Sequence, residues 1–280
     1  MCRSASRGTQ ISVTTDRRYD VARCVECGLR FTVPRPTPAE LETFYGEQYF
    51  TRGGDTDTAF GYERYDENSL AAINARRTWD DLKAWGPAAS AVPLKRLLDV
   101  GAATGEFGAR AAAEGWDVVA CEVGDTAREH AAAKGLQTIA TIDSAEGPFG
   151  LITMFHVLEH LIEPTEALRT SRELIDKDGV LAIELPQWRS AGRIVRRARW
   201  KQLRPPEHIN FFSTRSIAVA LQRTGWTVEF SATPYPRADE LAVQALKNKA
   251  LRPAADYGAK WLAGRLGLGG YLRVIARPAG

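Results

Sequence analysis

The chain has 280 residues, of which 44% are hydrophobic and 25% are charged, and its formal net charge is +3. This length and apolar content suffice for one substantial core with a small appendage, and so small a net charge does not require a nucleic-acid partner. The sequence contains neither a signal-peptide core nor an apolar run of the roughly 18 residues that a membrane span needs. We therefore expect a soluble, cytoplasmic protein, and the sequence leaves its oligomeric state open.

Residues 1–50 form a polar, proline-rich cap in which Cys24 and Cys27 have C-x-x-C spacing. A structural zinc site needs four ligands, and besides this pair the cap contains only Cys2. The fourth cysteine, Cys121, lies in an apolar segment, where a core thiol is expected. We therefore expect a metal-free, partial cysteine knuckle, and a zinc ion on Cys24, Cys27 and Cys2 is the alternative.

Residues 51–90 are predicted to form a helical lid. Leu70, Ile73 and Leu82 recur near helical spacing, and Gly86-Pro87 then ends the helix.

The remaining residues, 91–280, alternate short apolar segments with gaps of helix length. This alternation is typical of βαβ units around a parallel sheet. The first five apolar segments are "RLLDV", "DVVACE", "LQTIA", "LITMF" and "VLAIELP". After a helix at about residues 214–224 that ends on Gly225, "TVEFSA" and "YLRVIARP" complete the sheet, interrupted by a helical insertion at about 238–266. The predicted fold is α/β, with a Rossmann-like, seven-stranded, mostly parallel sheet, an antiparallel last strand and helices on both faces.

The turn after the first of these strands, in "RLLDVGAATGEFG", has the features of a ligand-binding loop. Ligands of such sheets bind in the crevice at the carboxyl ends of the strands. Gly101 and Gly105 permit a tight turn and a close approach to a ligand. The helix that begins near Gly105 directs free N–H groups toward the same place.

The end of the second strand indicates which cofactor binds there. Glu122 follows Asp99 by 23 positions, and its carboxylate can accept hydrogen bonds from both hydroxyls of a ribose. The glycine spacing differs from the dinucleotide pattern G-x-G-x-x-G. Asp99 would repel a pyrophosphate but suits a cationic amino group. S-adenosylmethionine, which has a ribose, an ammonium and a sulfonium, fits this arrangement.

Four segments then carry a resemblance to a known family. In this order, "LLDVGAATGEFG", "FHVLEHLIEP", "DGVLAIELPQ" and "PPEHINFFSTRSIAVALQRTGW" resemble the class I S-adenosylmethionine-dependent methyltransferases. The segment "RCVECGLRFTVPRPTPAELETFYGEQYF" is similar to a subgroup with an N-terminal cysteine knuckle. The resemblance covers roughly residues 20–50, 65–230 and 270–278. It implies a methyltransferase with a Rossmann-like fold and S-adenosylmethionine as its cofactor.

The resemblance also implies which residues bind the cofactor. They are the loop residues Asp99, Gly101, Ala102 and Gly105, the ribose acid Glu122, and the bordering pair Phe155 and His156. The chain departs from the family pattern twice. Ala103 replaces the middle glycine, which should still permit close approach, and Gly150 replaces an aspartate, which should cost only local hydrogen bonding.

Three histidines are candidate bases, because the pKa of histidine lies near neutrality: His208, His156 and His160. His156 and His160 follow the fourth strand, and His208 follows two prolines in "PPEHINFF", where it is expected to face the acceptor. Glu159 and His160 could instead begin a helix and hydrogen-bond to neighbouring loops, or contact substrate. Quinone-type O-methyltransferases use an acidic cluster in this region for a divalent metal, which is a further alternative.

Between Arg189 and Arg204, seven of sixteen residues are basic and none is acidic. The run could be a solvated helix face, or it could bind an anionic acceptor. Trp188 and Trp200 flank it, either to stack on a sugar or to anchor in the core. We expect O-methylation of a small molecule, a sugar, a glycan or a lipid-linked acceptor, and we do not expect nucleic acid. The alternatives are an RNA methyltransferase, a nicotinamide-dependent oxidoreductase and a non-catalytic zinc-binding module.

Overall fold

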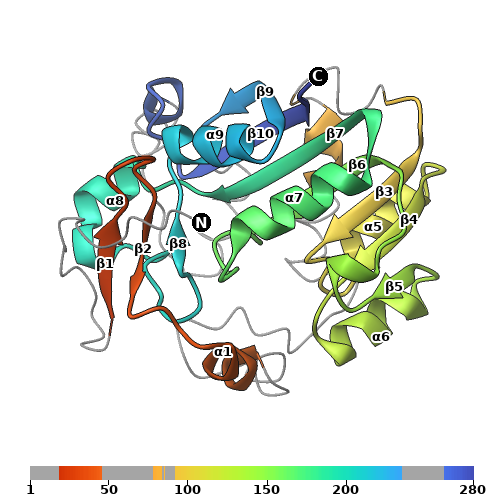
Figure 1. Cartoon of the computed structure of the whole chain (residues 1–280), viewed down its shortest axis with the longest axis horizontal. Coiled ribbons are helices and arrows are strands. Elements are labelled where there is room, and N and C mark those ends of the chain that lie inside the picture. Colours follow the sequence, from red (N-terminus) through yellow and green to blue (C-terminus); the bar gives the residue numbers. More distant parts are fainter. Residues whose placement is uncertain (1–18, 46–77, 84, 86–91, 235–261) are drawn as a thin grey trace, which may run out of the picture.

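The computed structural model describes residues 19–45, 78–83, 85, 92–234 and 262–280 (Figure 1). Its centre is a seven-stranded sheet with the order β5-β4-β3-β6-β7-β10-β9. The strands are β3 (Arg96–Val100), β4 (Asp117–Cys121), β5 (Gln137–Ile139), β6 (Phe149–Phe155), β7 (Ile175–Pro186), β9 (Trp226–Ala232) and β10 (Tyr271–Pro278).

The strand directions confirm the predicted fold class. Strands β3 to β7 pair in parallel, whereas β10 is antiparallel to both β7 and β9. The chain builds the sheet outward from β3 in one direction through β5, and then resumes at β6 on the other side of β3. The loops after β3 and β6 therefore diverge at a topological switch point, where α/β folds open a ligand crevice.

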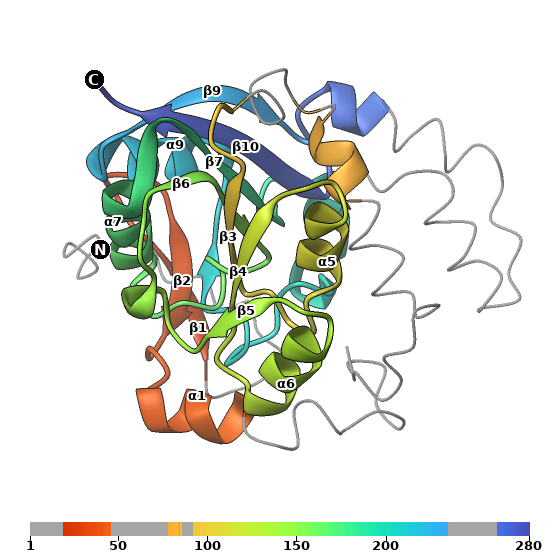
Figure 2. The same cartoon turned by 90° about the vertical axis from the view of Figure 1, so that its right-hand side faces the viewer.

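Helices cover both faces of this sheet, as Figure 2 shows. The first face carries α5 (Glu106–Ala112) and α6 (Asp125–Ala133), and the second carries α7 (Pro164–Leu174) and α9 (Thr214–Arg223). Successive side chains of a strand point to opposite faces. Leu97 accordingly packs in the core beside α5, and Leu98 in the core beside α7 and α9. Two apolar layers thus hold the sheet rigid behind its carboxyl edge.

The N-terminal cap contributes a second, smaller sheet. Strands β1 (Asp20–Arg23) and β2 (Arg30–Val33) form a hairpin, and β8 (Asn210–Phe211) pairs with β2. A short helix, α1 (Pro38–Tyr45), follows. Cys24 and Cys27 lie buried in the hairpin turn and form no disulfide. Because β8 comes from the sequence after β7, the cap is joined to the large domain at the edge of the predicted acceptor region.

Much of the predicted lid (51–90) and of the predicted insertion (238–266) lies outside the described residues. Within them, residues 78–83 and 262–265 are helical, and Trp79, Leu82 and Trp85 are buried against the α5 face. In the described part of the chain, no helix is long and apolar enough to cross a membrane.

Gly150 replaces the family's aspartate for a steric reason. A Cβ at this position would lie 1.8 Å from the carbonyl oxygen of Leu94. Any side chain would therefore displace the backbone that leads into β3. We expected that the exchange of aspartate for Gly150 costs only local hydrogen bonding. That expectation was incomplete, because an aspartate side chain at this position would not fit.

Candidate active site

The loop after β3 and the end of β4 form one hydrogen-bonded unit. The backbone N–H groups of Gly101 and Ala102 donate to the carbonyl oxygen of Cys121, at 2.8 and 3.1 Å. The N–H groups of Ala103 and Gly124 each donate to one carboxylate oxygen of Glu122, both at 3.0 Å. A carboxylate offers about four acceptor positions. Glu122 is thus fixed by two donors and keeps acceptor capacity for the two hydroxyls of a ribose.

The same loop requires backbone conformations that favour glycine. Gly101 and Gly105 have φ angles of 75° and 80°, and a Cβ on Gly101 would lie 2.5 Å from Cγ2 of Val157. Ala103 also has a positive φ, 47°, so this alanine adopts the conformation of the glycine it replaces. The surface beside Glu122 is therefore made largely of backbone, without side chains that would keep a ligand away from that carboxylate.

Asp99 lies beneath this loop and not on its surface. Its side chain is 4% exposed, and the hydroxyl of Thr153 donates to its Oδ1 at 2.7 Å. Burial raises the pKa of Asp99 to about 7, and the charge of Glu122 adds to this, although the Thr153 hydrogen bond opposes it. A cation bound nearby would favour the carboxylate form.

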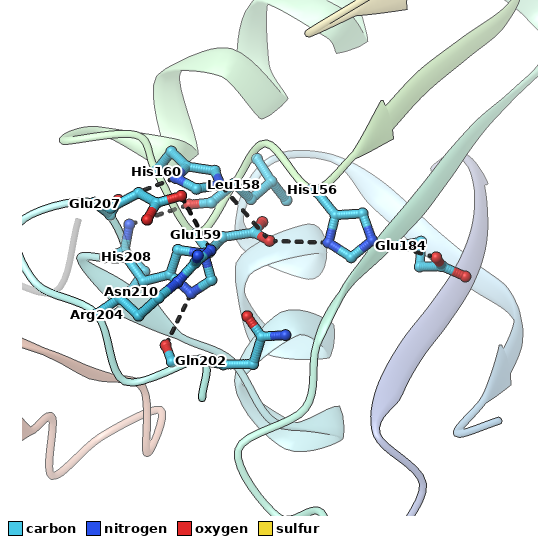
Figure 3. Close-up of polar contacts among 10 residues, drawn as sticks. All are labelled: His156, Leu158, Glu159, His160, Glu184, Gln202, Arg204, Glu207, His208 and Asn210. Atoms are coloured by element: carbon cyan, nitrogen blue, oxygen red, sulfur yellow. Dashed lines mark hydrogen bonds and ion pairs between the residues drawn. The ribbon is translucent and has the colours of Figure 1, made fainter. Parts of the chain in front are cut away.

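His156, at the end of β6, is held between two carboxylates (Figure 3). Its Nδ1 lies 3.3 Å from Oε1 of Glu159, and its Nε2 lies 3.4 Å from Oε1 of Glu184 on β7. Desolvation lowers the pKa of His156, but the two hydrogen-bonded carboxylates outweigh it and raise the pKa to about 10. The side chain of His156 is 44% exposed, and the two carboxylates favour its protonated form, which opposes a role as proton acceptor. Arg273 of β10 pairs with Glu184 from the other side.

The segment after β6 is a turn, so Glu159 and His160 do not begin a helix, but both hydrogen-bond to the neighbouring 207–210 segment, as the same alternative expected. The helix α7 begins only at Pro164. The carbonyl oxygen of Glu159 accepts hydrogen bonds from the N–H groups of Ile209 and Asn210, at 2.8 and 3.0 Å. The amide of Asn210 donates to the carbonyl oxygens of Leu158 and Leu161 in return, at 3.1 and 2.7 Å. These contacts join two motifs that are some fifty residues apart in sequence.

His160 and His208 meet inside this joined unit, with ring centroids 4.7 Å apart. Each Nδ1 lies near a backbone carbonyl oxygen, that of Glu207 at 3.0 Å for His160 and that of Gln202 at 2.8 Å for His208. A carbonyl oxygen only accepts, so we assign the ring proton to Nδ1 in both neutral histidines.

The Nε2 atoms of the two rings differ in their surroundings. Nε2 of His208 lies 3.1 Å from a guanidinium nitrogen of Arg204, which can only donate. His208 is 3% exposed, and burial, together with the charges of His160 and Arg204, lowers its pKa well below 6.5. His160 is 19% exposed, and its Nε2 lies 4.0 Å from Oε1 of Glu159. The prediction that His208 faces the acceptor as a base stays untested, but its basic nitrogen already has a partner.

Metal ligation has one candidate cluster in the described part of the chain. Glu159, His160 and His208 each offer one ligand atom, and these atoms lie within 4.8 Å of one another. The Arg204 guanidinium occupies the ligand nitrogen of His208, which opposes a cation at that position. Cys24 and Cys27 belong to no such cluster among the described residues, and Cys2 lies outside them. The zinc site therefore stays a prediction.

Trp188 and Trp200 are core anchors. They are 6% and 7% exposed, and their rings meet edge to face at 5.9 Å. Of the two alternatives for this pair, the structure shows core anchoring. Sequence reasoning missed Glu184, although a charged residue near the end of an apolar strand was a usable signal.

Comparisons with known proteins agree with this geometry. A family model described as a methyltransferase domain matches residues 66–230. The ubiquinone biosynthesis O-methyltransferase of Caulobacter sp. (strain K31) is 32% identical over 99 residues, which cover 31% of this chain and 39% of that protein. The matched segment thus spans less than half the length of this curated relative.

Two solved structures show the fold at low sequence identity. Magnesium protoporphyrin IX methyltransferase from Synechocystis PCC 6803, crystallised with bound S-adenosylhomocysteine, has a TM-score of 0.57 and 14% identity and covers 87% of this chain and 100% of its own. The [4+2]-cyclase SpnF has a TM-score of 0.51 and 20% identity and covers 78% of this chain and 86% of its own. Because a cyclase shares the fold, the fold alone does not assign the reaction.

Proposed function

The chain belongs to the methyltransferase domain family, the S-adenosylmethionine-dependent class that its motifs predict, and we propose that it methylates an oxygen atom of a small molecule. The observation that carries the donor half of the proposal is Glu122, held by the N–H groups of Ala103 and Gly124 at the carboxyl edge of the sheet. The printed name of the curated relative, an O-methyltransferase, supports oxygen as the acceptor atom.

S-adenosylmethionine supplies a methyl group that its sulfonium charge already activates. The chain's own residues have to bind the donor, align the acceptor and take up the acceptor's proton. Gly101, Ala102 and Gly105 shape the surface for the nucleoside, Glu122 binds the ribose, and Phe155 and His156 border it. Asp99 lies below the loop, where its carboxylate stabilises a cation.

We assign the proton acceptor to His160. The carbonyl oxygen of Glu207 holds its proton on Nδ1, so the basic Nε2 is directed toward Glu159. The carboxylate of Glu159 stabilises the imidazolium that forms. Glu159 and Glu184 favour the protonated form of His156, and the Nε2 of His208 already accepts from Arg204. These two histidines therefore act as positioning residues.

The finer features of the acceptor belong to this proposal as well. The basic run between Arg189 and Arg204, which follows β7, favours an anionic acceptor, which could be a sugar, a glycan or a lipid-linked molecule. RNA is the main alternative, and a steep salt dependence of RNA binding would favour it. A cytoplasmic location, the cysteine-knuckle subgroup and zinc on Cys24 and Cys27 remain predictions, and the metal content of the purified protein tests the last.

Calorimetric titration with S-adenosylhomocysteine tests the donor site. We expect Glu122→Ala to weaken binding by about 1.5–3 kcal/mol, because it removes charged hydrogen bonds to the ribose. Glu129→Ala, which removes an exposed carboxylate on α6, is the matched control and should bind normally. Titration with NADH tests the oxidoreductase alternative. Unchanged affinity in Glu122→Ala, or tighter binding of NADH than of S-adenosylhomocysteine, would overturn the proposal.

A further inference from the structure

A cavity of ≈ 650 Å³ lies between the β1–β2 hairpin, the loop after β7 and the start of α9. Five arginines line it, and none of its lining residues is acidic. The five arginines come from four separate elements: the β1–β2 hairpin, the loop after β7, α8 (Ala191–Arg196) and α9. The five are Arg23, Arg30, Arg189, Arg193 and Arg215.

The charges of these arginines are not compensated within the described part of the chain. There, none of the five forms an ion pair with a carboxylate, whereas other arginines of the same region do, such as Arg204 with Glu207. Burial, and then the charges of Arg23, Arg193 and Arg189, lower the pKa of Arg30 to about 10. The Nε atoms of Arg30 and Arg193 are buried and have no hydrogen-bond partner among the described residues. Buried donors without acceptors are costly, so this cluster is suited to an anion.

Trp188 holds two of these guanidinium groups in place. The guanidinium carbon of Arg193 lies 4.2 Å from the Trp188 ring centroid, and that of Arg30 lies 4.9 Å from it. Arg30 comes from β2 and Arg193 from α8, so the buried indole fixes two cations from distant parts of the sequence. Cation–π contacts of this kind reduce the freedom of a guanidinium before any ligand arrives.

The chemistry of the cavity favours a phosphate polyanion. Guanidinium groups bind phosphate oxygens with two parallel hydrogen bonds. A single phosphate group carries a charge of at most about −2, less than five arginines can balance, and a diphosphate carries more. Thr214, the first residue of α9, also lines the cavity, and a helix N-terminus favours negative charge.

We propose that this cavity binds the diphosphate group of an organic ligand. Gln187, which lines it, follows Glu184 by three residues along β7 and the loop after it, a span of about 10 Å for extended chain. Glu184 is the partner of His156 at the donor edge. A diphosphate here therefore leaves the rest of its molecule within reach of the methyl donor. That this molecule is the methyl acceptor rests on the proposed function, but the anion site itself does not.

Calorimetry with inorganic diphosphate and with inorganic phosphate tests the site directly, without methyl transfer. We expect diphosphate to bind more tightly than phosphate. Arg30→Gln/Arg193→Gln should weaken diphosphate at least about tenfold, or about 1.4 kcal/mol. Arg196→Gln/Arg199→Gln is the matched control, because both arginines belong to the same basic run but are exposed and outside the cavity. It should bind diphosphate as the unaltered protein does.

Further measurements distinguish a soluble from a lipid-linked diphosphate ligand, and loss of binding from loss of folding. Uridine diphosphate represents a soluble ligand, and geranyl diphosphate represents a lipid-linked one. The ligand that binds with the higher affinity identifies the class of molecule to which the diphosphate belongs. Arg189→Gln/Arg215→Gln removes two cavity charges but keeps Arg30 and Arg193, the two arginines that stack on the Trp188 ring. It therefore tests the site even if the first pair of substitutions prevents folding. The proposal is wrong if no diphosphate binds, or if the control pair loses as much affinity as the cavity pairs. Titration of S-adenosylhomocysteine into the same samples measures separately whether the proposed donor site binds its ligand.

Discussion

The donor side and the acceptor side of the candidate active site are built in different ways. On the donor side, Glu122 and the loop after β3 are close in sequence, and backbone N–H groups make most of the contacts. On the acceptor side, side chains from the β1–β2 hairpin, the turn after β6, the loop after β7 and the 204–210 segment come together from distant parts of the sequence. The donor side thus depends on conformation, and the acceptor side on the pairing of side chains. Substitutions should therefore have different consequences on the two sides.

The largest effect is expected on the acceptor side, at His160. If its Nε2 accepts the acceptor's proton, His160→Ala should lower kcat by about 10²–10⁴-fold, while S-adenosylhomocysteine binds unchanged. His208→Ala should instead lower the free energy of unfolding by about 1–3 kcal/mol, because it removes a buried ring and leaves the partly buried carbonyl of Gln202 without its donor. Single-turnover methyl transfer, with an acceptor found by labelling a cell extract, measures the first effect, and urea unfolding the second. If His208→Ala abolishes transfer in a stable protein, the roles of these histidines are reversed.

The second prediction concerns the conformation of the donor loop. Gly101→Ala should lower the free energy of unfolding by about 2–5 kcal/mol, because backbone strain at positive φ adds to a clash with Val157. Gly115→Ala is the matched control. Gly115 has a φ of 84°, and a Cβ there would have nothing within 4 Å. It should cost only the strain, about 1–2 kcal/mol.

Urea unfolding of both variants gives the difference directly, and the same samples give the affinity for S-adenosylhomocysteine. Equal destabilisation of the two variants would mean that Val157 moves aside, and that the close approach at Gly101 is not what the fold requires of this glycine.

The difference between the donor side and the acceptor side also explains which features of the structure could be predicted from the sequence. The seven-stranded, mostly parallel sheet with its antiparallel last strand and the loop at Gly101 follow from local periodicity and spacing, and the structure agrees with them. The position of His156 between Glu159 and Glu184 was not predicted. A charged residue near the end of an apolar strand was a signal for Glu184, but periodicity does not show which side chain it faces. The arginine cavity could not be predicted either, because Arg30 and Arg193 are distant in sequence and meet only across the Trp188 ring. Long-range pairing of side chains leaves no periodic signal in a single sequence.

The third prediction uses the buried acid of the donor side. The pKa of Asp99 is about 7 without ligand, so the carboxyl is mostly protonated at pH 6 and mostly ionised at pH 8. If the cofactor's ammonium lies near it, binding favours the carboxylate. Affinity for S-adenosylhomocysteine should then rise with pH by up to about tenfold per unit below pH 7 and level off above it. Calorimetry from pH 5.5 to 8.5 measures this slope.

Asp99→Asn provides the control, since the amide does not titrate and its affinity should be flat over the same range. The raised pKa also affects folding: the neutral carboxyl stabilises the fold fully below its ordinary pKa of 3.8, and this contribution is lost as pH rises through about 7. The difference in unfolding free energy between the unaltered protein and Asp99→Asn should therefore be smaller at low pH than at pH 8. A pH slope that persists in Asp99→Asn would place the titrating group elsewhere.

The smallest effect is expected at Ala103, where the donor loop departs from the family's glycine. Its φ of 47° is unfavourable for an L-residue, and the hydrogen bond from its N–H to Glu122 holds it in place. Ala103→Gly should relieve strain of about 1–2 kcal/mol, but the unfolded chain gains freedom worth about 0.4–1 kcal/mol. We therefore expect a net stabilisation between zero and about 1.6 kcal/mol, measured as a higher urea midpoint with an unchanged slope. Affinity for S-adenosylhomocysteine should stay the same, because the contact with Glu122 is made by backbone. A loss of affinity would show that the methyl group of Ala103, and not only its N–H, contributes to the donor site.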